Sequence, residues 1–449
     1  MSARHLITVT SVLLLAGAAI AQDAPRPKNV ILMIGDGMGY NAVAAGSLFQ
    51  YGEERAQPYW QYQHFPMSTF SDSTPGGYDA AKAWESFEYF LQSPTDSAAA
   101  ATTLNTGVKT TNGAIGVGGD GKPLRSLIDD AEEMGKATGV LSTVYLSHAT
   151  PASFVAHDPS RKNVEVLAQE MVLQSKVDLI MAPGHPLFDD SGKPATGDGT
   201  DQKVKTPSYG YVGGEAVWKQ LQEGTAGGDA NGDGTPDPWK LIETTEGILS
   251  LKSGETPARV FAIPPVRAAL QVNRDGSHDV GAFEVPFSLG LPNMHDLMES
   301  ALNVLSKDEQ GFFLMAEGGA IDWAAHANKV GRLIEEQQDF DQAIAATAAW
   351  IEKNSSWDET LLIITADHET GYITGPGSKP DWKPLVNNGK GKMPGVEWHT
   401  GSHSNQLVPL FAKGAGAEQF LKHIAGEDKR LGKYVDNTSV AKVVREVWK

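Results

Sequence analysis

Five short apolar runs, rich in Val, Ile and Leu, recur along the chain, and each leads into a glycine or a polar side chain. They lie at residues 28–39, 137–147, 311–319, 359–371 and 407–414. Stretches that favour helix lie between and around them, at residues 97–106, 122–135, 162–174, 293–306, 320–352 and 438–448. Buried strands that alternate with helices predict an α/β fold. We expect a large, mainly parallel central sheet flanked by helices on both faces.

Two regions depart from this alternation. Residues 185–257 are rich in Gly, Asp, Lys and Thr, and residues 374–403 are rich in Gly, Pro and Lys. Both predict surface insertions over the strand ends, because neither shows a periodic apolar pattern of its own. We therefore expect a single domain over residues 22–449 that carries these two insertions.

The N-terminal segment predicts a targeting signal. A short basic start with Arg4 precedes the apolar run "LITVTSVLLLAGAAI", and Ala19-Ile20-Ala21 is a small-x-small cleavage site. This pattern is typical of a secretory signal peptide over residues 1–21. The run is shorter than the roughly 20 apolar residues that span a bilayer. We expect a periplasmic or secreted protein without a membrane anchor.

The charge and the residue types limit the partners and the metal ligands. The chain has 37 Lys and Arg against 55 Asp and Glu, which gives a net charge of −18. Such an acidic chain argues against nucleic acid or an anionic membrane as the main partner. There are no cysteines, so any transition metal must be held by His, Asp and Glu.

Polar side chains lie just after the predicted strands. Ligands of open α/β sheets bind outside the carboxyl ends of the strands, so these side chains should share one rim of the sheet. They are Asp36, His148, Glu317, Asp367 and His368.

Several of these residues favour a metal centre. Asp322 and His326 are four residues apart in a helical stretch and share one face, although an incidental surface pair would look the same. Adjacent Asp367 and His368 suit zinc, although a helix-capping Asp beside a surface His is the alternative. The cluster as a whole would repel itself without cations, and more than one divalent ion would fit; its carboxylates are Asp36, Glu317, Asp322 and Asp367.

Two histidines before the last apolar run, His399 and His403, offer one more nitrogen ligand. One of them would complete the metal centre, and the other would be a loop residue.

Ser97, in "TDSAAAAT", begins a helical stretch and has no general base close to it in the sequence. Zinc lowers the pKa of a coordinated hydroxyl strongly, as it does for water. The helix start adds backbone N–H donors and a favourable dipole for an anion. The alternative is a simple helix cap, and Asp96 or Thr95 could serve as that cap instead.

Two further residues suit phosphate and a hard cation. The guanidinium of Arg161 is a planar fork that matches two phosphate oxygens, although an ordinary surface arginine beside Lys162 is the alternative. Thr150 could offer its hydroxyl oxygen to magnesium together with Asp36 and Glu317.

The stretch "DANGDGTPD" follows the spacing of a calcium loop, with Gly234 at the turn position. Its twelfth position is Lys240 in place of Glu, so the pattern is incomplete, and a polar turn is the alternative. The candidate calcium ligands are Asp229, Asn231, Asp233 and Asp237.

Six motifs, in order, resemble the alkaline phosphatase family. They are "GDGMG", "TDSAAAAT", "HATPASFVAHDPSRK", "EGGAIDWAAHAN", "TADHETG" and "HSNQLVPLFAKG", and the likeness extends over residues 28–448 apart from the insertions.

The resemblance implies the role of each site residue. Ser97 would be the nucleophile and Arg161 the phosphate clamp. One zinc ion would be held by Asp322, His326 and His403. A second zinc ion would be held by Asp36, Asp367 and His368, with Ser97 joining it. Magnesium would be held by Asp36, Thr150 and Glu317. His403 is preferred to His399 because its distance to "FAKG" matches the family's ligand. His148 and Trp323 stand where the enteric bacterial pattern has Asp and Lys, near the magnesium and the phosphate.

The resemblance also implies an activity and an assembly. These are the hydrolysis of phosphate monoesters at alkaline pH through a phosphoserine, and a homodimer. A phosphodiesterase or sulfatase on the same fold is the alternative. A sulfatase would need a cysteine or another serine motif, and phosphodiesterases more often use Thr and lack the arginine. In a non-catalytic exported zinc-binding protein, Ser97 and Arg161 would have no purpose.

Overall fold

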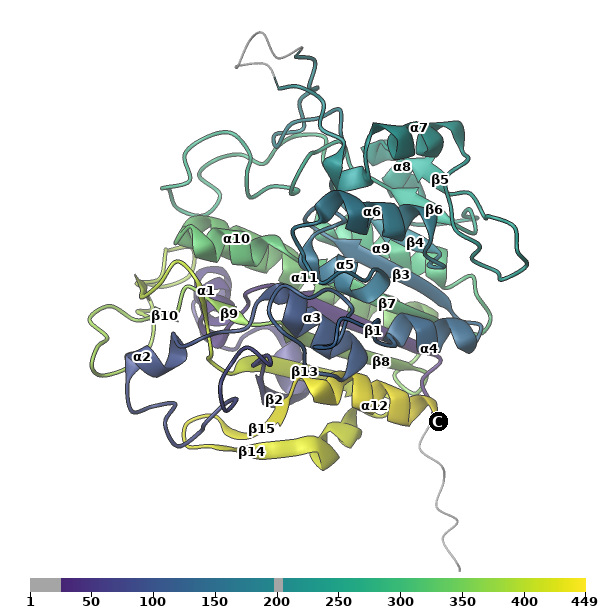
Figure 1. Cartoon of the computed structure of the whole chain (residues 1–449). Helices are drawn as coiled ribbons and strands as arrows, with labels where there is room; N and C mark the ends of the chain where they lie inside the picture. The colour runs from purple at the N-terminus through teal and green to yellow at the C-terminus, as the bar shows by residue number, and fades with distance from the viewer. Residues whose placement is uncertain (1–25, 198–204) are drawn as a thin grey trace, which may run out of the picture.

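A computed structural model describes residues 26–197 and 205–449 (Figure 1), so the predicted signal peptide lies outside the described residues. The centre of the molecule is an eleven-stranded sheet. In spatial order, its strands are β14 (Ile424–Asp428), β15 (Gly432–Asp436), β2 (Gln63–Ser68), β13 (Val408–Gly414), β8 (Thr360–Ala366), β1 (Asn29–Gly35), β7 (Phe312–Gly318), β3 (Ala137–Ser142), β4 (Leu179–Met181), β6 (Val260–Ala262) and β5 (Lys240–Ile242).

The sheet is mainly parallel, as the sequence predicts. From β8 through β1, β7, β3, β4 and β6 to β5, each strand pairs in parallel with its neighbour. Every residue of β1, β7 and β8 is buried, which explains the continuous apolar runs, because helices cover both faces of such strands. The exceptions are β13, which pairs antiparallel with both β8 and β2, and the antiparallel pair of β14 and β15 at one margin.

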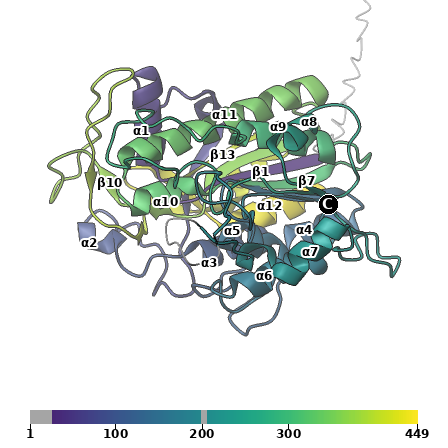
Figure 2. The same ribbon diagram turned by 90° about the horizontal axis from the view of Figure 1, so that it is seen from above.

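Helices cover both faces of this sheet (Figure 2). One face carries α1 (Tyr40–Tyr51), α9 (Met294–Leu305) and α11 (Val330–Asn354), with α11 in contact with both of the others. The opposite face carries α3 (Ser97–Thr106), α4 (Leu127–Glu133), α5 (Ala149–Val155), α6 (Val164–Leu173) and α12 (Thr438–Trp448).

The prediction of one helix over residues 320–352 is wrong. The stretch forms α10 (Ala320–His326) and then α11, and Asn328 lies between them with φ of 54°. This left-handed conformation ends an α-helix, and Asn is one of the few non-glycine residues that adopt it readily. As a result, α10 is a separate short helix that begins two residues after β7.

The segment 185–257 is more than a surface insertion. It contains α7 (Glu215–Glu223) and α8 (Thr245–Ser250), and its strand β5 extends the central sheet by pairing with β6. Residues 374–403 have little regular structure beyond the pairing of β10 (Ile373–Thr374) with β11 (Glu397–Trp398). The remaining short elements are α2 (Phe87–Phe90), β9 (Glu369–Thr370), β12 (His403–Ser404), and the 3-10 turns η1 (Pro58–Gln61), η2 (Gly210–Val212) and η3 (Ala417–His423). Within the described ranges, no helix has both the length and the apolar character needed to span a membrane.

Candidate active site

The register of the three central strands brings carboxylates together at one end of the sheet. Gly35 at the end of β1 pairs with Gly318 of β7 and with Ala366 of β8. Asp36, Glu317 and Asp367 lie at or next to these positions, and all three are completely buried. The parallel pairing therefore explains how residues more than 300 positions apart share one site.

Three histidines join these carboxylates: His368, which follows Asp367, and His148 and His403 from two other segments. Within each of three overlapping groups, the possible ligand atoms lie within 4.8 Å of one another. The groups are Asp322, His368 and His403; Asp36, Asp367 and His368; and Asp36, His148 and Glu317.

Many oxygen and nitrogen atoms of this cluster that could bind a metal have no hydrogen-bond partner among the described residues. Buried polar atoms without a partner are costly, so their concentration here fits a site for cations. The unpartnered atoms are both carboxylate oxygens of Asp36, Oδ2 of Asp367, Oε1 of Glu317, Oγ1 of Thr150 and Nδ1 of His148.

The raised pKa values of the buried carboxyl groups also indicate a cation site. Burial, reinforced by the neighbouring carboxylates, raises the pKa of Asp36 well above its usual range and that of Asp367 to about 7. Burial also raises the pKa of Glu317 to about 8. Three negative charges are unfavourable in this space, and bound divalent cations would remove the conflict. Oxygen and imidazole donors together suit zinc and magnesium.

Asp322 lies between two imidazoles. Its carboxylate oxygens are 3.3 Å from Nε2 of His326 and 3.7 Å from Nε2 of His403, and the two Nε2 atoms are 3.1 Å apart. Nδ1 of His326 lies 2.7 Å from the carbonyl oxygen of Gly401, and Nδ1 of His403 lies 2.8 Å from that of Thr95. A carbonyl partner on Nδ1 leaves Nε2 available for a metal.

His399 lies outside this cluster. Its Nε2 is 2.7 Å from Oγ1 of Thr374, and its ring packs against Phe87 and Tyr372. Of the two histidines before the last long strand, the structure therefore places only His403 beside Asp322.

Ser97 is the first residue of α3, and Asp96 caps the helix. The Asp96 carboxylate accepts a hydrogen bond of 3.0 Å from the backbone N–H of Ala99, so the Ser97 hydroxyl is not needed as a cap. Ser97 is 2% exposed, and its Oγ lies 3.1 Å from Nε2 of His368. The hydroxyl thus faces the group of Asp36, Asp367 and His368.

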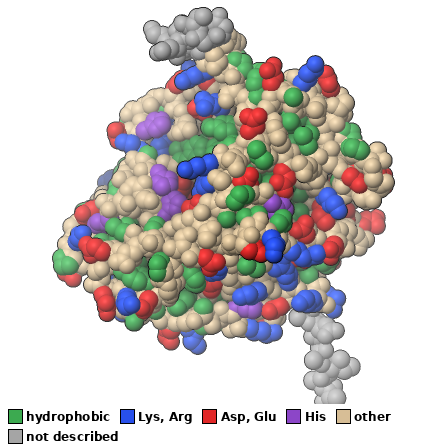
Figure 3. All heavy atoms as spheres, viewed as in Figure 1, with side chains coloured by type: hydrophobic (Ala, Val, Ile, Leu, Met, Phe, Trp, Pro, Cys, Tyr) green, Lys and Arg blue, Asp and Glu red, His purple; other side chains and the backbone are tan. Residues whose placement is uncertain are grey.

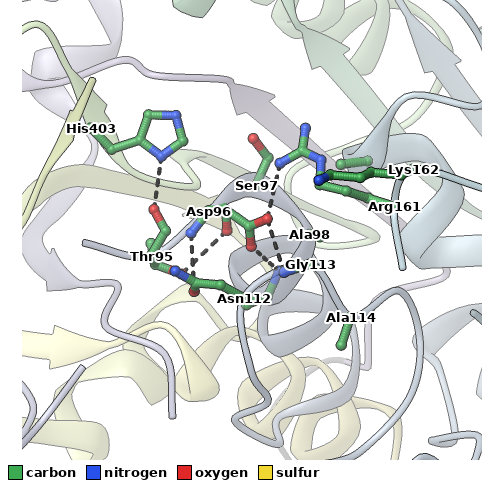
Figure 4. Close-up of polar contacts among 12 residues, drawn as sticks. Thr95, Asp96, Ser97, Ala98, Asn112, Gly113, Ala114, Arg161, Lys162 and His403 are labelled. Carbon is green, nitrogen blue, oxygen red and sulfur yellow. Dashed lines mark hydrogen bonds and ion pairs between the residues drawn. The ribbon is translucent and has the colours of Figure 1, made fainter. Parts of the chain in front are cut away.

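Arg161 lies beside the start of α3 (Figure 4). Its Nη1 is 3.1 Å from Oδ2 of Asp96, and the same oxygen accepts a hydrogen bond from the N–H of Gly113. Nη2 of Arg161 is 3.4 Å from Nε2 of His148. The guanidinium is therefore oriented by Asp96, a role that the sequence analysis missed and that the position directly before Ser97 could have indicated.

His148 lies beside Asp36 and Glu317, Thr150 lies within reach of Glu317, and Trp323 packs against His148. Nδ1 of His148 is 4.0 Å from carboxylate oxygens of both Asp36 and Glu317, and burial lowers the pKa of this histidine to about 3. The imidazole is therefore neutral at ordinary pH. The Trp323 ring lies 5.8 Å from the His148 ring.

Two hydroxyl groups that the sequence analysis missed hold carboxylates of the site. Ser142 donates to Glu317, and Thr370 donates a 2.6 Å hydrogen bond to Asp322. Ser142 could have been found from strand register, because it ends β3 directly opposite Glu317. Thr370 had no signal beyond its nearness to His368.

The predicted calcium loop uses its carboxylates within the loop itself. Asp229 accepts hydrogen bonds from the N–H groups of Gly232 and Gly234, and Asp237 accepts one from Ala230. Asp233 similarly accepts from Thr235. Among the described residues, this loop contains none of the groups of close ligand atoms found at the sheet edge, and calcium binding here stays a prediction.

Comparison with known proteins gives the family. The protein-family model for alkaline phosphatase matches residues 27–396, which is most of the chain. The chain belongs to the alkaline phosphatase family.

Curated relatives agree with this membership. Alkaline phosphatase 4 of Bacillus subtilis is 31% identical over 372 residues, which cover 81% of this chain and 66% of the relative. Alkaline phosphatase of Escherichia coli is 29% identical over 381 residues, which cover 80% of this chain and 73% of the relative. The chain spans slightly less than two thirds of the length of the Bacillus subtilis relative.

Solved structures of this family share the fold. Alkaline phosphatase from the Antarctic bacterium TAB5 is similar at 26% identity with a TM-score of 0.61, covering 95% of this chain and 98% of that one. The cold-active enzyme from Shewanella sp. has a TM-score of 0.65 at 24% identity, covering 94% of this chain and all of that one, and it supports the fold. The mainly parallel sheet is thus that of a metal-dependent enzyme family, and the chain has candidate ligand groups at its edge.

Proposed function

We propose that this protein hydrolyses phosphate monoesters, with Ser97 as the nucleophile and Arg161 as the phosphate-binding residue. The observation that carries the proposal is the position of the Ser97 hydroxyl, which lies 3.1 Å from His368 in the buried carboxylate and histidine cluster. Family membership supports the same activity.

We assign three metal ions to the cluster. One zinc would be held by Asp322, His326 and His403, a second by Asp36, Asp367 and His368, and magnesium by Asp36, Thr150 and Glu317. The unpartnered buried donors support this assignment, and a variant of the TAB5 enzyme was solved with Mg bound in its M3 site. Bound zinc supplies Lewis-acid chemistry, which lowers the pKa of a nearby hydroxyl and stabilises negative charge on oxygen.

The side chains of the chain account for the rest of the reaction. Arg161 binds two phosphate oxygens with its planar fork, and Asp96 holds the guanidinium in place. The Ser97 hydroxyl gives up its proton and its oxygen attacks phosphorus. The bond to the alcohol oxygen breaks and that oxygen takes up a proton, which gives a phosphoserine and releases the alcohol. Water then attacks the phosphoserine and releases inorganic phosphate with Ser97 restored. A monoester dianion has three free oxygens, so it uses the arginine more fully than a diester does.

The proposal is tested with purified protein on p-nitrophenyl phosphate and bis(p-nitrophenyl) phosphate, with metal analysis before and after chelation. We expect turnover of the monoester to exceed that of the diester and to disappear with the metals. Ser97→Ala should keep its metal content and lose turnover, whereas Ser86→Ala, at an exposed serine before α2, should keep both. A preference for the diester would favour a phosphodiesterase, and full activity of Ser97→Ala would refute the assigned nucleophile.

We also propose export through cleavage after residue 21, one catalytic domain over residues 22–449, and a homodimer. The basic start and apolar run of the N-terminus support export, and the shared central sheet supports a single domain. N-terminal sequencing of the exported protein and light scattering of the purified protein test these points.

A further inference from the structure

Three aromatic side chains lie beside the phosphate-binding arginine and have no role in the chemistry above. Tyr145 follows β3, Trp323 is the neighbour of Asp322 in α10, and Tyr211 belongs to η2 in the segment 185–257. All three are partly exposed. We refer to Tyr145, Tyr211 and Trp323 as the aromatic wall.

The rings of the aromatic wall are arranged around His148. Tyr145 and Tyr211 are stacked, with ring centroids 3.9 Å apart and planes 8° apart. Trp323 lies 6.1 Å from Tyr145. The edge-on imidazole of His148 lies 5.2 Å from the Tyr145 ring and 5.8 Å from the Trp323 ring. The wall is therefore one connected surface.

This surface lies directly next to the place proposed for phosphate. His148, which contacts both Tyr145 and Trp323, is 3.4 Å from Nη2 of Arg161. Trp323 also follows the ligand Asp322 in α10. On the face shown in Figure 3, hydrophobic side chains gather in a hollow beside histidine and basic side chains. A molecule held by Arg161 would thus have the wall within reach of its alcohol portion.

Core packing does not explain the stacked tyrosines. Both rings are only partly buried, and within the described residues neither hydroxyl makes a hydrogen bond. Tyr211 comes from a segment that contributes none of the proposed ligands to the centre. Aromatic rings that stay partly exposed beside a charged site are well suited to stacking on a planar ligand.

We propose that the aromatic wall is a leaving-group subsite, which favours phosphate monoesters whose alcohol carries a planar aromatic ring, as nucleoside 5′-monophosphates do. This inference rests on the proposed function and specifies its substrate class. The phosphate binds at Arg161, and the ring packs against the wall. A small polar alcohol has no ring to stack on the aromatic wall and gains no such contact. The wall should therefore favour esters of aromatic-bearing alcohols over esters of small polar alcohols.

The test compares adenosine 5′-monophosphate with ribose 5-phosphate, because both are esters of a primary sugar alcohol and differ in the base. We expect kcat/KM to favour the nucleotide roughly tenfold, in keeping with the strength of base–aromatic stacking. Tyr211→Ala should bring the ratio of the two kcat/KM values close to one, and Tyr211→Phe should preserve the wild-type ratio. Tyr51→Ala, at an exposed tyrosine that ends α1, is the matched control and should also preserve it.

Binding provides a second readout without turnover. Isothermal titration of metal-loaded Ser97→Ala protein with the same two compounds should give a similar ratio of dissociation constants, and adding Tyr211→Ala should reduce it.

The outcomes distinguish failure of the proposed phosphatase function from failure of the proposed aromatic subsite. If wild-type protein hydrolyses neither compound nor p-nitrophenyl phosphate, the proposed function fails. If it hydrolyses both at equal kcat/KM, or if Tyr211→Ala lowers both values in proportion, the aromatic wall is not a subsite and the proposed function stands.

Discussion

The Asp96 carboxylate joins the start of α3 to the guanidinium of Arg161, through a hydrogen bond from Ala99 on one oxygen and a 3.1 Å contact with Nη1 on the other. One side chain therefore caps the helix that carries Ser97 and orients Arg161, the residue proposed to bind phosphate.

These two roles of Asp96 can be separated by mutation. Asp96→Asn keeps the capping oxygen but replaces the oxygen that accepts from Arg161 and Gly113 with an amide N–H group. We therefore expect inorganic phosphate to inhibit several-fold more weakly, with a smaller loss in the free energy of unfolding than in Asp96→Ala. Asp96→Ala removes the cap as well and should lower the free energy of unfolding by about 1 kcal/mol. Inhibition assays and denaturant melts measure the two effects, with exposed Asp120→Asn as control. Equal inhibition by phosphate in Asp96→Asn and wild type would contradict the orienting role.

Arg161→Lys tests the planar fork separately from the positive charge. Lysine keeps the charge and loses bidentate pairing, so we expect kcat/KM for a monoester to fall on the order of tenfold or more. The loss for a diester should be smaller, since a diester has fewer free oxygens to bind. Lys162→Arg, at the exposed neighbouring position, is the control. A uniform loss for both substrates would indicate that charge alone matters.

Asp36→Asn should raise the free energy of unfolding of the metal-free protein and lower that of the metal-loaded protein. Both oxygens of Asp36 are buried without partners near the carboxyl groups of Glu317, Asp322 and Asp367, which together with burial raise the pKa of Asp36 well above its usual range. In chelated protein the amide therefore removes the cost of either burying this negative charge or protonating it. We expect the free energy of unfolding of the metal-free protein to rise by about 1–3 kcal/mol, while metal-loaded protein is destabilised through lost ligation. Thermal melts with and without EDTA measure both. Destabilisation of the metal-free protein would contradict the reading of this cluster as a cation site.

Asp341 gives a pH dependence through a carboxyl whose hydrogen-bond partners include none of the proposed metal ligands. Burial raises the pKa of this carboxyl to about 6, although Tyr59, Gln57 and Gln337 donate hydrogen bonds to it. A raised carboxyl pKa means that the folded state binds the proton more tightly than the unfolded state does. Its contribution to stability is complete below the unfolded value of about 3.9 and is lost as the pH rises through about 6.

Asp341→Asn should therefore remove this fall in stability, which we expect to be about 2–3 kcal/mol between pH 4 and 7. The comparison is made between the slopes of wild type and variant, each in EDTA, so that metal binding does not contribute. Exposed Asp358→Asn should keep the wild-type slope. Identical slopes for wild type and Asp341→Asn would show that Asp341 does not titrate in this range.

The central part of the fold could be predicted from the sequence because its strands are buried on both faces. Such strands read as uninterrupted apolar runs, as in β1, β7 and β8. The short strands β4, β5 and β6 have three residues each, which is too few for a pattern. The break between α10 and α11 depends on the left-handed backbone of Asn328, and helix periodicity does not reveal it.

The candidate site was predictable where a candidate ligand lies at or just after the end of a strand. Asp36, Glu317 and Asp367 share an edge because of strand order alone. The contacts that orient the ligands come from residues without such a signal, such as Asp96 on Arg161 and Thr370 on Asp322. The choice of His403 over His399 came from family spacing and stays a prediction; His403 lies beside Asp322 and His368, whereas His399 is 2.7 Å from Oγ1 of Thr374.

The segment 185–257 supplies both Tyr211 beside the site and β5 at the margin of the sheet. Exchanging it between related proteins, to redirect which alcohols are accepted, therefore also exchanges an edge strand. A chimaera that preserves the pairing of β5 with β6 can vary the residues around η2 freely, whereas one that shortens the whole segment would expose β6 to intermolecular pairing and aggregation.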